Sequence, residues 1–288
     1  MADQMQDVKR RIKSVGTTER ITGAMKLVSA SKLRKAKARF EHSEYFLKNV
    51  MESIAGLFKE APDVVPEQYI MEKRNIETTC FLVITGSSGL CGTFNGNVIR
   101  ETEKAISQCK GKVTLVTVGS KGYDHFKRQN YGILGFRNED VEDLEYDEAG
   151  KIVAPLIEKY HKGELDEIIL IYTSYVNTLV QEVIRERLLP MDLSSEDKRP
   201  AKAVSMEYDP SPKEVFAYLV DKYFQLKLYS AAIESSTCEN AARRKAMETA
   251  NENARDMLAD LNKKYNRARQ EQITGEILEI VSGSEAQV

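Results

Sequence analysis

Proline is confined to the middle of this chain, and that distribution limits the folds open to it. All seven prolines lie between Pro62 and Pro212, so the two ends of the chain contain none. The middle also holds eleven of the sixteen glycines, between Gly86 and Gly163. Proline and glycine interrupt helices, whereas a long segment without proline can continue as one helix. The pattern therefore indicates two helical arms that flank a segment of mixed structure.

The first arm carries one stripe of apolar or small side chains at steps of three and four residues. Its mean step is about 3.5 residues, the heptad spacing that produces a left-handed coiled coil. At about 1.5 Å per residue, the arm would form a helix of about 85 Å. Gly16, Gly23 and Gly56 would each weaken that helix by up to about 1 kcal/mol relative to alanine. The stripe comprises Met5, Val8, Ile12, Val15, Thr22, Met25, Ser29, Leu33, Ala36, Phe40, Leu47, Val50, Ile54 and Leu57.

The second arm carries a similar stripe. Ser211 and Pro212 suit the N-cap and the first position of a helix, which would be about 105 Å long. Its register also places Asn240, Arg244 and Asn251 in the stripe, where polar side chains weaken packing but fix the alignment of two helices. The other members are Phe216, Leu219, Tyr223, Leu226, Ser230, Ile233, Thr237, Met247, Ala254, Leu258, Leu261, Tyr265 and Ala268.

A long helix with one apolar stripe needs a partner, because the stripe stabilises little until it is buried. The middle segment returns the chain, so the simplest partner is the other arm, in an antiparallel coiled coil. The second arm is longer, and we expect its apolar end, Ile277, Leu278, Ile280 and Val281, to project beyond the first. A projecting apolar tip implies an apolar socket in another protein. Fraying of the terminus and contact between copies of the chain are the alternatives.

The middle segment alternates strand, glycine-containing turn and helix, which indicates a mainly parallel, Rossmann-like α/β sheet. The expected strands are Cys80–Thr85, Lys112–Val118, Glu167–Ser174 and, as a further candidate, Leu179–Leu188, and the expected helices are 95–109, 121–129 and 148–162. The predicted fold class is α/β with long N- and C-terminal helical arms.

Gly86, Gly89 and Gly92 follow the first expected strand and invite comparison with a phosphate loop, because amides at a helix N-terminus bind anions. Their spacing matches neither G-x-G-x-x-G nor G-x-x-x-x-G-K-[ST], and no lysine follows to meet a phosphate. We therefore interpret the loop as a structural turn. Cys91 has no catalytic partner nearby in the sequence and is expected to be a packed small residue. No pair of carboxylates stands out as an acid–base dyad.

Composition argues against several other classes of protein. Charged residues make up 30% of the chain, and the mean hydropathy is −0.43. The longest apolar runs fall far short of the ~18 residues needed to cross a bilayer, and the N-terminal residues show no apolar core of a signal peptide. The four cysteines lack CxxC spacing and the three histidines are far apart. A disulfide scaffold and a zinc site are therefore not expected.

The first arm is basic, since residues 9–39 contain eleven Lys or Arg and one acid, Glu19. Such a segment would suit nucleic acid, an anionic membrane or an acidic protein. Residues 1–39 contain no aromatic side chain to stack on bases. The apolar stripe in the same segment also disfavours a basic helix free to enter DNA. We favour an acidic protein partner, with a DNA-binding coiled coil and a merely solvated face as the alternatives.

Residues at both ends and in the middle of the chain resemble the gamma subunits of F-type ATP synthases, in the family's order. Near the N-terminus they are Arg11–Val15, Thr18, Ile21, Thr22, Ala24–Val28 and Ser31–Leu33; in the middle, Gly89–Gly92, Phe94 and Asn95; toward the C-terminus, Glu239, Ala242, Arg243, Ala246, Met247, Ala250, Asn253, Ala254, Asp256, Arg267–Gln270, Ile273, Thr274, Glu276, Glu279 and Gly283. Gly23, Arg244 and Ser284 depart from the family, which commonly has lysine, methionine and alanine there. None of the three removes a chemical group on which the resemblance depends.

The resemblance implies a rotor subunit with no catalytic site, cofactor or metal of its own. In this family an antiparallel coiled coil turns inside a ring of three alpha and three beta subunits. The asymmetric shaft couples ion-driven rotation of the membrane c-ring to the conformations of the catalytic beta subunits. The implied partners are the alpha3-beta3 hexamer, the epsilon subunit and the c-ring, with no nucleic acid and no insertion into the membrane. The implied location is peripheral, at the cytoplasmic face of a bacterial plasma membrane.

The resemblance also assigns contacts to individual residues. The lever loop of beta would meet Lys9, Lys13, Met25 and Lys26; the catch loop of beta would meet Arg269, Gln270 and Thr274; the apolar bearing tip would be Ile277, Leu278, Ile280 and Val281; and the foot toward the c-ring and epsilon would be Tyr208 and Asp209.

The expected domain organisation has three parts. Residues 1–61 and 211–288 would form the shaft, residues 75–190 the α/β domain, and residues 191–210 a linker or foot. An α/β enzyme that uses the glycine loop is an alternative function, and it would bind nucleotide or phosphate as the isolated chain.

Overall fold

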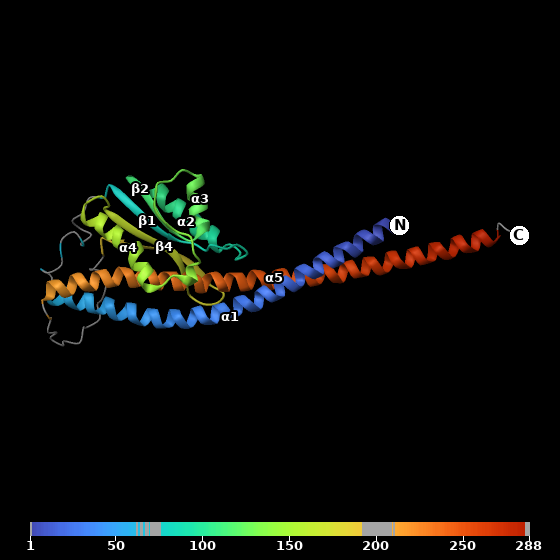
Figure 1. The fold of residues 1–288 in the computed structure, drawn as a ribbon, viewed down its shortest axis with the longest axis horizontal. Helices are drawn as coiled ribbons and strands as arrows, with labels where there is room; N and C mark the ends of the chain where they lie inside the picture. The colour runs from blue at the N-terminus through green and yellow to red at the C-terminus, as the bar shows by residue number, and fades with distance from the viewer. Residues whose placement is uncertain are drawn as a thin grey trace. The chain divides into compact units, whose positions relative to one another are not determined.

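The computed structural model describes residues 2–61, 63, 66, 69, 76–191, 209 and 211–285. The chain divides into two compact units, of which the first comprises Met1–Ala30 with Arg243–Val288 and the second comprises Ser31–Ala242. Two long helices, α1 (Ala2–Glu60) and α5 (Pro212–Glu285), each contribute residues to both units (Figure 1).

In the first unit, α1 and α5 pack against each other and run antiparallel. A Cβ atom on Gly16 would contact Leu258 at 4.0 Å, and Asn251 lies 3.2 Å from Thr22, so partner numbers fall along α5 as they rise along α1. The two arms thus pair as expected within this unit, whereas the coiled-coil geometry and its hand stay predictions. The stripe residues that are buried or half-buried here are Met5, Val8, Ile12, Val15, Thr22, Met25, Ser29, Arg244, Met247, Asn251, Ala254, Leu258, Leu261, Tyr265 and Ala268.

The second unit is built on one five-stranded sheet. Its strands lie in the order β3-β2-β1-β4-β5. β5 is antiparallel to β4, and the other neighbours are parallel. A sheet with mostly parallel neighbours is therefore present, as expected. The strands are β1 (Thr78–Ile84), β2 (Lys112–Val118), β3 (Ile133–Arg137), β4 (Glu167–Tyr175) and β5 (Gln181–Leu189).

The helices between the strands begin and end close to the predicted positions. They are α2 (Phe94–Gln108), α3 (Ser120–Arg128) and α4 (Tyr146–His161), with a short 3-10 helix, η4 (Val141–Asp143), before α4. The side chains of Glu145 and Glu148 form a capping box at the start of α4, which satisfies amides that a helix N-terminus leaves unpaired. The candidate strand 179–188 is β5. β3 was not predicted, because its five residues contain no long apolar run.

Helices cover both faces of the sheet (Figure 1). On one face, α2 and α3 pack against the alternate strand residues, as the two-residue period of a strand requires. On the other face lie α4 and parts of α1 and α5. The first core includes Phe81, Val83, Val98, Phe126 and Ile171, and the second includes Ile54, Leu82, Tyr160, Leu170 and Phe224.

One stretch of α5 in this unit is buried on all sides. Every residue from 230 to 241 is buried. On the α1 side, the hydroxyl oxygens of Ser43 and Ser230 lie 3.2 Å apart, and on the sheet side Ser235 bonds to Thr173. Small residues dominate this stretch, which reads SAAIESSTCENA, and small side chains allow close packing on opposite sides of one helix. In this stretch α5 therefore packs against α1 on one side and against the sheet on another.

Candidate partner-contact surfaces

The carboxyl ends of parallel strands are the usual ligand-binding position of an open α/β sheet. In this protein α5 occupies that position at the end of β4. Ser235 Oγ accepts a hydrogen bond from the Thr173 amide at 3.2 Å. Glu234 Oε1 accepts one from Ser174 Oγ at 2.6 Å and one from the Tyr175 amide at 2.8 Å. The end of this strand therefore fastens the sheet to a helix.

Helix α5 also lies against the glycine loop that follows β1. The Gly86 amide donates to Asn95 Oδ1 at 2.8 Å, and a Cβ atom on Gly86 would lie 2.6 Å from Glu239 Oε1. A carboxylate of α5 thus borders the loop and takes up space beside Gly86. Cys91 is 2% exposed and packs beside Cys238, which confirms that it is a packed small residue. The geometry supports a structural turn and disfavours a phosphate site.

Burial changes the pKa of two ionisable side chains near β4. Burial raises the pKa of Glu234 above the ordinary carboxyl value, against the lowering effect of its bonds to Ser174 and Tyr175 and of the charge on Lys227. Burial also raises the pKa of the Cys238 thiol, and such a thiol is a poor nucleophile at neutral pH. Among the described residues, no three His, Cys, Asp or Glu side chains are grouped so that they could hold a metal ion. Both side chains bond to the end of β4, Glu234 to Ser174 and Tyr175 and Cys238 to the Thr173 carbonyl, which is a structural role.

Glu142 of η4 connects that short helix to both long helices of the second unit. Lys32 on α1 forms an ion pair with its carboxylate, and Arg39 Nη1 donates to its carbonyl at 2.8 Å. From α5, Asn240 Nδ2 lies 3.5 Å from Glu142 Oε2. Two of the cations that make the first arm basic are thus engaged within the chain itself.

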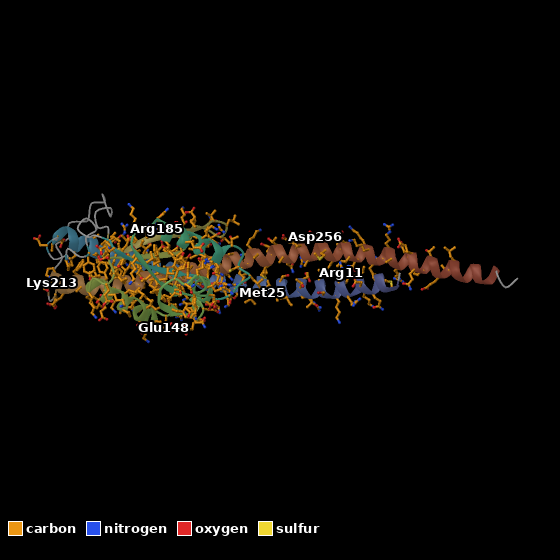
Figure 2. The ribbon with its side chains drawn as sticks, turned by 90° about the horizontal axis from the view of Figure 1, so that it is seen from above. Arg11, Met25, Glu148, Arg185, Lys213 and Asp256 are labelled. Carbon is orange, nitrogen blue, oxygen red and sulfur yellow. The ribbon has the colours of Figure 1, made fainter. Side chains whose placement is uncertain are left out.

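The residues assigned to the beta lever loop lie on α1 in the first unit. Lys9 and Lys13 are exposed, whereas Met25 (labelled in Figure 2) and Lys26 are half-buried. Lys26 Nζ lies 2.8 Å from Glu248 Oε1 on α5. The hydrogen bond and the charge of Lys26 lower the pKa of Glu248. Part of the Lys26 charge is therefore compensated before any partner binds.

The residues assigned to the beta catch loop are together on α5 and are all exposed. Thr274 Oγ1 donates to the Gln270 carbonyl at 2.9 Å, so its proton is engaged within the helix. Arg267, three residues before Gln270, forms an ion pair with Glu271, and the two charged atoms are 2.9 Å apart. The side chains of Arg269 and Gln270 are open to solvent, and a guanidinium and an amide can together bond to carboxylates or carbonyls of a partner.

The bearing tip and the foot are described only in part. Ile277 is 54% exposed and Leu278 is 60% exposed, so the end of α5 presents apolar side chains to solvent. The side chains of Ile280 and Val281 lie outside the described part of the chain. Tyr208 also lies outside it, and Asp209 is exposed. Within the described residues, no helix combines the length and apolarity needed to cross a membrane.

Sequence reasoning missed an apolar face of α1 in the first unit. Ile21 is 54% exposed, Leu27 is 71% exposed and Val28 is 57% exposed. The signal was available, because these apolar residues fall outside the stripe that packs on α5. They leave an apolar strip beside the lysines of the same helix.

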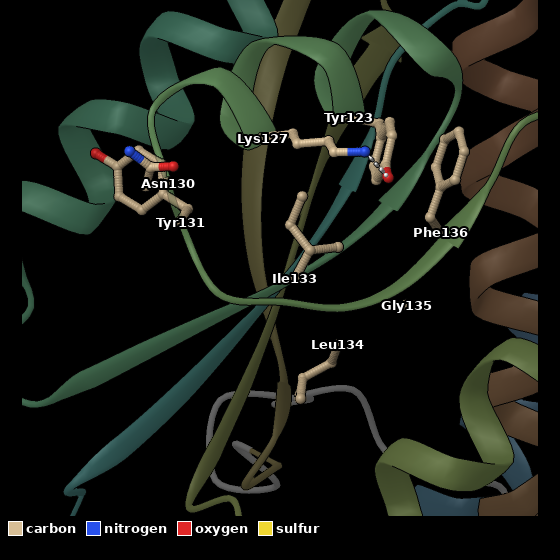
Figure 3. A pocket seen from close by; sticks show the side chains of 8 residues that line it. All are labelled: Tyr123, Lys127, Asn130, Tyr131, Ile133, Leu134, Gly135 and Phe136. Carbon is tan, nitrogen blue, oxygen red and sulfur yellow. Dashed lines mark hydrogen bonds between the residues drawn. The ribbon is translucent and has the colours of Figure 1, made fainter.

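A shallow hollow of about 530 Å³ lies between α3 and the edge strand β3 (Figure 3). On its wall, the rings of Tyr123 and Phe136 stack with their centroids 3.7 Å apart. Lys127 Nζ donates to the Tyr123 hydroxyl at 3.0 Å. The aromatic stack and the cation of this hollow are thus already engaged with one another.

Another concave surface lies between α1, α5 and the start of α4, all in the second unit. We name it the aromatic groove. It has a volume of about 540 Å³, and its lining combines aromatic rings with cations. The lining includes Phe46, Tyr146, Tyr218 and Tyr229, with Arg39 and Lys222 at its border.

Comparison with known proteins finds relatives along nearly the whole chain. The model of the ATP synthase family matches residues 4–287. The ATP synthase gamma chain of Alkaliphilus metalliredigens is 38% identical over 286 residues, which cover 98% of each chain. The sodium ion specific ATP synthase gamma chain of Acetobacterium woodii is 36% identical over 303 residues, which cover 99% of each chain.

Solved structures share the fold. A chain of the Euglena gracilis mitochondrial ATP synthase in rotational state 3 aligns with a TM-score of 0.69 at 18% identity, covering 100% of this chain and 95% of that one. A chain of the central stalk and c-ring of the Tetrahymena thermophila mitochondrial ATP synthase aligns with a TM-score of 0.61 at 22% identity, covering 80% of this chain and 99% of that one.

Proposed function

Because the chain belongs to the ATP synthase family as one of its gamma chains, we propose that it is the central rotor shaft of an F-type ATP synthase. It couples ion-driven rotation of the membrane c-ring to conformational cycling of the catalytic beta subunits, in ATP synthesis and, reversed, in hydrolysis. The observation that carries this proposal is the family match over residues 4–287, which includes both long helices and the α/β sheet.

A rotor must transmit torque from its α/β domain to its helices. The bonds between α5 and the end of β4 suit that task, because a buried set of hydrogen bonds resists sliding more than apolar contact does. Ser235 holds the Thr173 amide, and Glu234 holds Ser174 and Tyr175. On the other helix, Lys32 and Arg39 hold η4. Torque applied to the sheet would therefore reach both helices of the second unit.

We propose that the chain has no catalytic site and no cofactor of its own. The usual ligand position of its sheet is bordered by α5, and Glu239 lies against the glycine loop. Nucleotide chemistry in the complex then belongs to the beta subunits. The alternative, an α/β enzyme, requires the glycine loop to hold a phosphate beside that carboxylate.

The contacts proposed on the shaft differ in kind. Lys9 and Lys13, both exposed, would face the acidic lever loop of beta, where exposed charges attract or repel without a fixed geometry. Met25 and Lys26 would contribute less to that contact, because both are half-buried and Lys26 is paired with Glu248. Arg269, Gln270 and Thr274 would form hydrogen bonds to the catch loop that break at each step.

The two ends of the rotor complete the assignment. The apolar tip around Ile277 and Leu278 would turn in an apolar sleeve of the hexamer, and Tyr208 and Asp209 would lie in the foot that meets epsilon and the c-ring. Residues 1–61 and 211–288 are proposed as an antiparallel left-handed coiled-coil shaft, residues 75–190 as the Rossmann-like domain and residues 191–210 as the linker or foot. The complex would place this chain peripherally, at the cytoplasmic face of a bacterial plasma membrane.

Co-assembly tests the proposal. The chain would be expressed with the alpha, beta and epsilon subunits of its own organism, and the complex would be isolated through a tag on beta. We expect a complex with one copy of this chain per three alpha and three beta subunits, and with ATPase activity. An alpha–beta complex that forms and hydrolyses ATP but leaves this chain behind would contradict the proposal.

A further inference from the structure

We propose that α1 bends at a joint formed by Glu19–Gly23, and that Asn251 of α5 holds this joint closed. Bending here swings the N-terminal end of α1 away from α5, while residues 24–30 stay packed on that helix. The inference extends the proposed function, because a shaft pushed by neighbouring subunits is where such a bend acts. Gly23 stands where the family commonly has lysine, so the joint is inferred for this chain and not from the resemblance.

The main chain of the joint is easily opened. Gly23 lies inside α1, where glycine favours a helix less than alanine does, by up to about 1 kcal/mol. In an α-helix its amide bonds to the Glu19 carbonyl, four residues earlier. Thr22 Oγ1 lies 3.0 Å from that carbonyl oxygen and 3.0 Å from the carbonyl oxygen of Thr18. This hydroxyl can therefore satisfy a carbonyl that loses its helical partner, and such side chains often bend helices.

The facing stretch of α5 lacks these features. Residues 247–262 contain no glycine. Asn251 directs its side-chain amide across to α1, to the Glu19 carbonyl and to Thr22 Oγ1, and not to its own helix. The bend is therefore expected in α1 while α5 stays straight.

The joint also separates two stretches that pack differently within the first unit. On its N-terminal side, the four stripe residues from Met5 to Val15 are only half-buried, and so is Leu258 of α5. From the joint onward, Thr22 and Ser29 are buried. Separating half-buried side chains from a neighbouring helix exposes less apolar surface than separating buried ones. The N-terminal stretch is therefore the part of α1 that can leave α5 first.

Two residues of α5 keep the joint closed. Asn251 Nδ2 lies 2.6 Å from the Glu19 carbonyl oxygen and 3.2 Å from Thr22 Oγ1. Arg255 Nε lies 3.0 Å from Glu19 Oε1, an exposed contact that contributes little. Moving Glu19 away from α5 breaks these contacts and leaves the buried Asn251 amide without a partner, which opposes opening. Asn251 therefore sets most of the free energy needed to open the joint.

The joint divides the lysines assigned to the lever loop of beta. Lys9 and Lys13 lie on its N-terminal side, whereas Lys26 lies beyond it and is paired with Glu248. A push on Lys9 or Lys13 therefore bends α1 at Gly23 before it displaces Lys26.

Hydrogen exchange at single amides tests the inference, because the amide of residue 23 loses its partner when the joint opens. The full chain would be measured alone and in complex with alpha and beta, and the deuterium would be located by electron-transfer dissociation. We expect a local minimum of protection at Gly23, about tenfold below the protection of Val15 and of Ala254 on α5. Protection that falls steadily toward the N-terminus, with no minimum at Gly23, would show fraying and would overturn the inference.

Three variants sharpen the test. Asn251→Ala should lower the protection of the residue 23 amide about a further tenfold, because both bonds that hold the joint are lost. If Asn251 instead only competes with this amide for the Glu19 carbonyl, protection rises and the inference fails. In the Asn251→Ala background, Gly23→Ala should raise the protection about fivefold. Gly16→Ala is the matched control in the same background, and it should leave the protection of residue 23 within about twofold.

Equal effects of the two glycine substitutions would contradict a joint at Gly23, because they would indicate a general gain in helix stability. Exchange is read on the chain itself and needs no catalysis. Failure of the chain to assemble with alpha and beta would therefore count against the rotor assignment without changing the result for the joint.

Discussion

Asn251 on α5 donates a hydrogen bond from Nδ2 to the main-chain carbonyl oxygen of Glu19 on α1, with the two atoms 2.6 Å apart. The same nitrogen lies 3.2 Å from Thr22 Oγ1. Asn251 is 6% exposed, so water competes little for these bonds. A polar residue in an otherwise apolar stripe fixes the alignment of two helices, because any other alignment leaves it buried and unpaired. In the first unit this residue therefore sets the register of α1 against α5.

Asn251→Ala should lower the free energy of unfolding by about 1–2 kcal/mol, because it removes both bonds. Gly23 lies opposite, where a Cβ atom would be 3.3 Å from Asn251 Nδ2. In the Asn251→Ala background, Gly23→Ala should therefore raise the free energy of unfolding by up to about 1 kcal/mol, because alanine favours a helix more than glycine does. In the wild-type background the same substitution should raise it less, because the new Cβ atom crowds Asn251. Chemical denaturation of the four proteins measures this coupling. Equal effects of Gly23→Ala in both backgrounds would contradict the contact.

Glu234→Gln should change how stability depends on pH. Burial raises the Glu234 pKa, so the folded chain binds this proton more tightly than the unfolded chain. The stability from this group is fully present below the unfolded carboxyl pKa of about 4.3 and is lost as the pH rises through the raised folded value. A glutamine can accept the bonds from Ser174 and Tyr175 without a charge.

Denaturation of wild type and Glu234→Gln at about pH 4 and about pH 8 measures the difference, since the first lies below the unfolded glutamate pKa of about 4.3 and the second lies well above it. We expect the variant to lose less stability over this interval than the wild type. Glu234→Ala is the control, and it should cost about 1–3 kcal/mol at both values because it leaves the Tyr175 amide unpaired. Identical pH profiles for wild type and Glu234→Gln would refute the role of burial.

Alanine should destabilise the chain at Gly119 and be tolerated at Gly89. Gly119 has a φ of +94°, and a Cβ atom there would lie 1.9 Å from the Thr85 carbonyl oxygen, so Gly119→Ala should cost at least about 2 kcal/mol. Gly89 has no atom within 4 Å of such a Cβ, and Gly89→Ala should stay within about 0.5 kcal/mol of wild type. Thermal unfolding measures both.

The same Gly89→Ala variant also tests the phosphate interpretation of the glycine loop. If the loop is only a turn, the variant should retain full ATPase activity in the complex. A loss of nucleotide binding by the isolated chain on this substitution would instead favour the enzyme alternative.

Arg269→Leu combined with Gln270→Leu should lower ATPase turnover of the assembled complex about tenfold, because the hydrogen bonds proposed to the catch loop would be absent. Arg267→Leu is the matched control, since Arg267 is exposed nearby but is already paired with Glu271. Steady-state hydrolysis by purified complexes measures the effect. Unchanged turnover in the double variant, or an equal loss in the control, would contradict the proposed hydrogen bonds to the catch loop.

Periodicity predicted the two long helices and the side on which they pair, since the stripe residues of the first unit are those that turn inward. It did not predict the burial of residues 230–241, because a single-stripe interpretation assumes one buried face. The signal was in the composition, since SAAIESSTCENA consists mostly of small residues, which permit contact on all sides. β3 escaped prediction because a short edge strand needs few apolar residues.

The sequence predicts on which helix each candidate contact residue lies, but it does not predict which side chains surround that residue. The sequence places Lys26 on a basic helix, yet its bond to Glu248 depends on the alignment of two segments more than two hundred residues apart. The aromatic groove was not predicted for a related reason, since Phe46 and Tyr218 come from opposite arms and Tyr146 comes from the middle segment. Such surfaces follow from tertiary contacts, on which local spacing gives no information.

Direct observation of rotation tests the central claim. The alpha3-beta3 hexamer would be fixed to a surface, and a probe would be attached through an added cysteine at Lys110, beyond the end of α2, in a chain whose native cysteines are replaced by serine or alanine. With ATP, we predict that the probe turns in one direction in steps of one third of a turn, as three catalytic beta subunits require. A complex that hydrolyses ATP at full rate while the probe stays still would contradict the account.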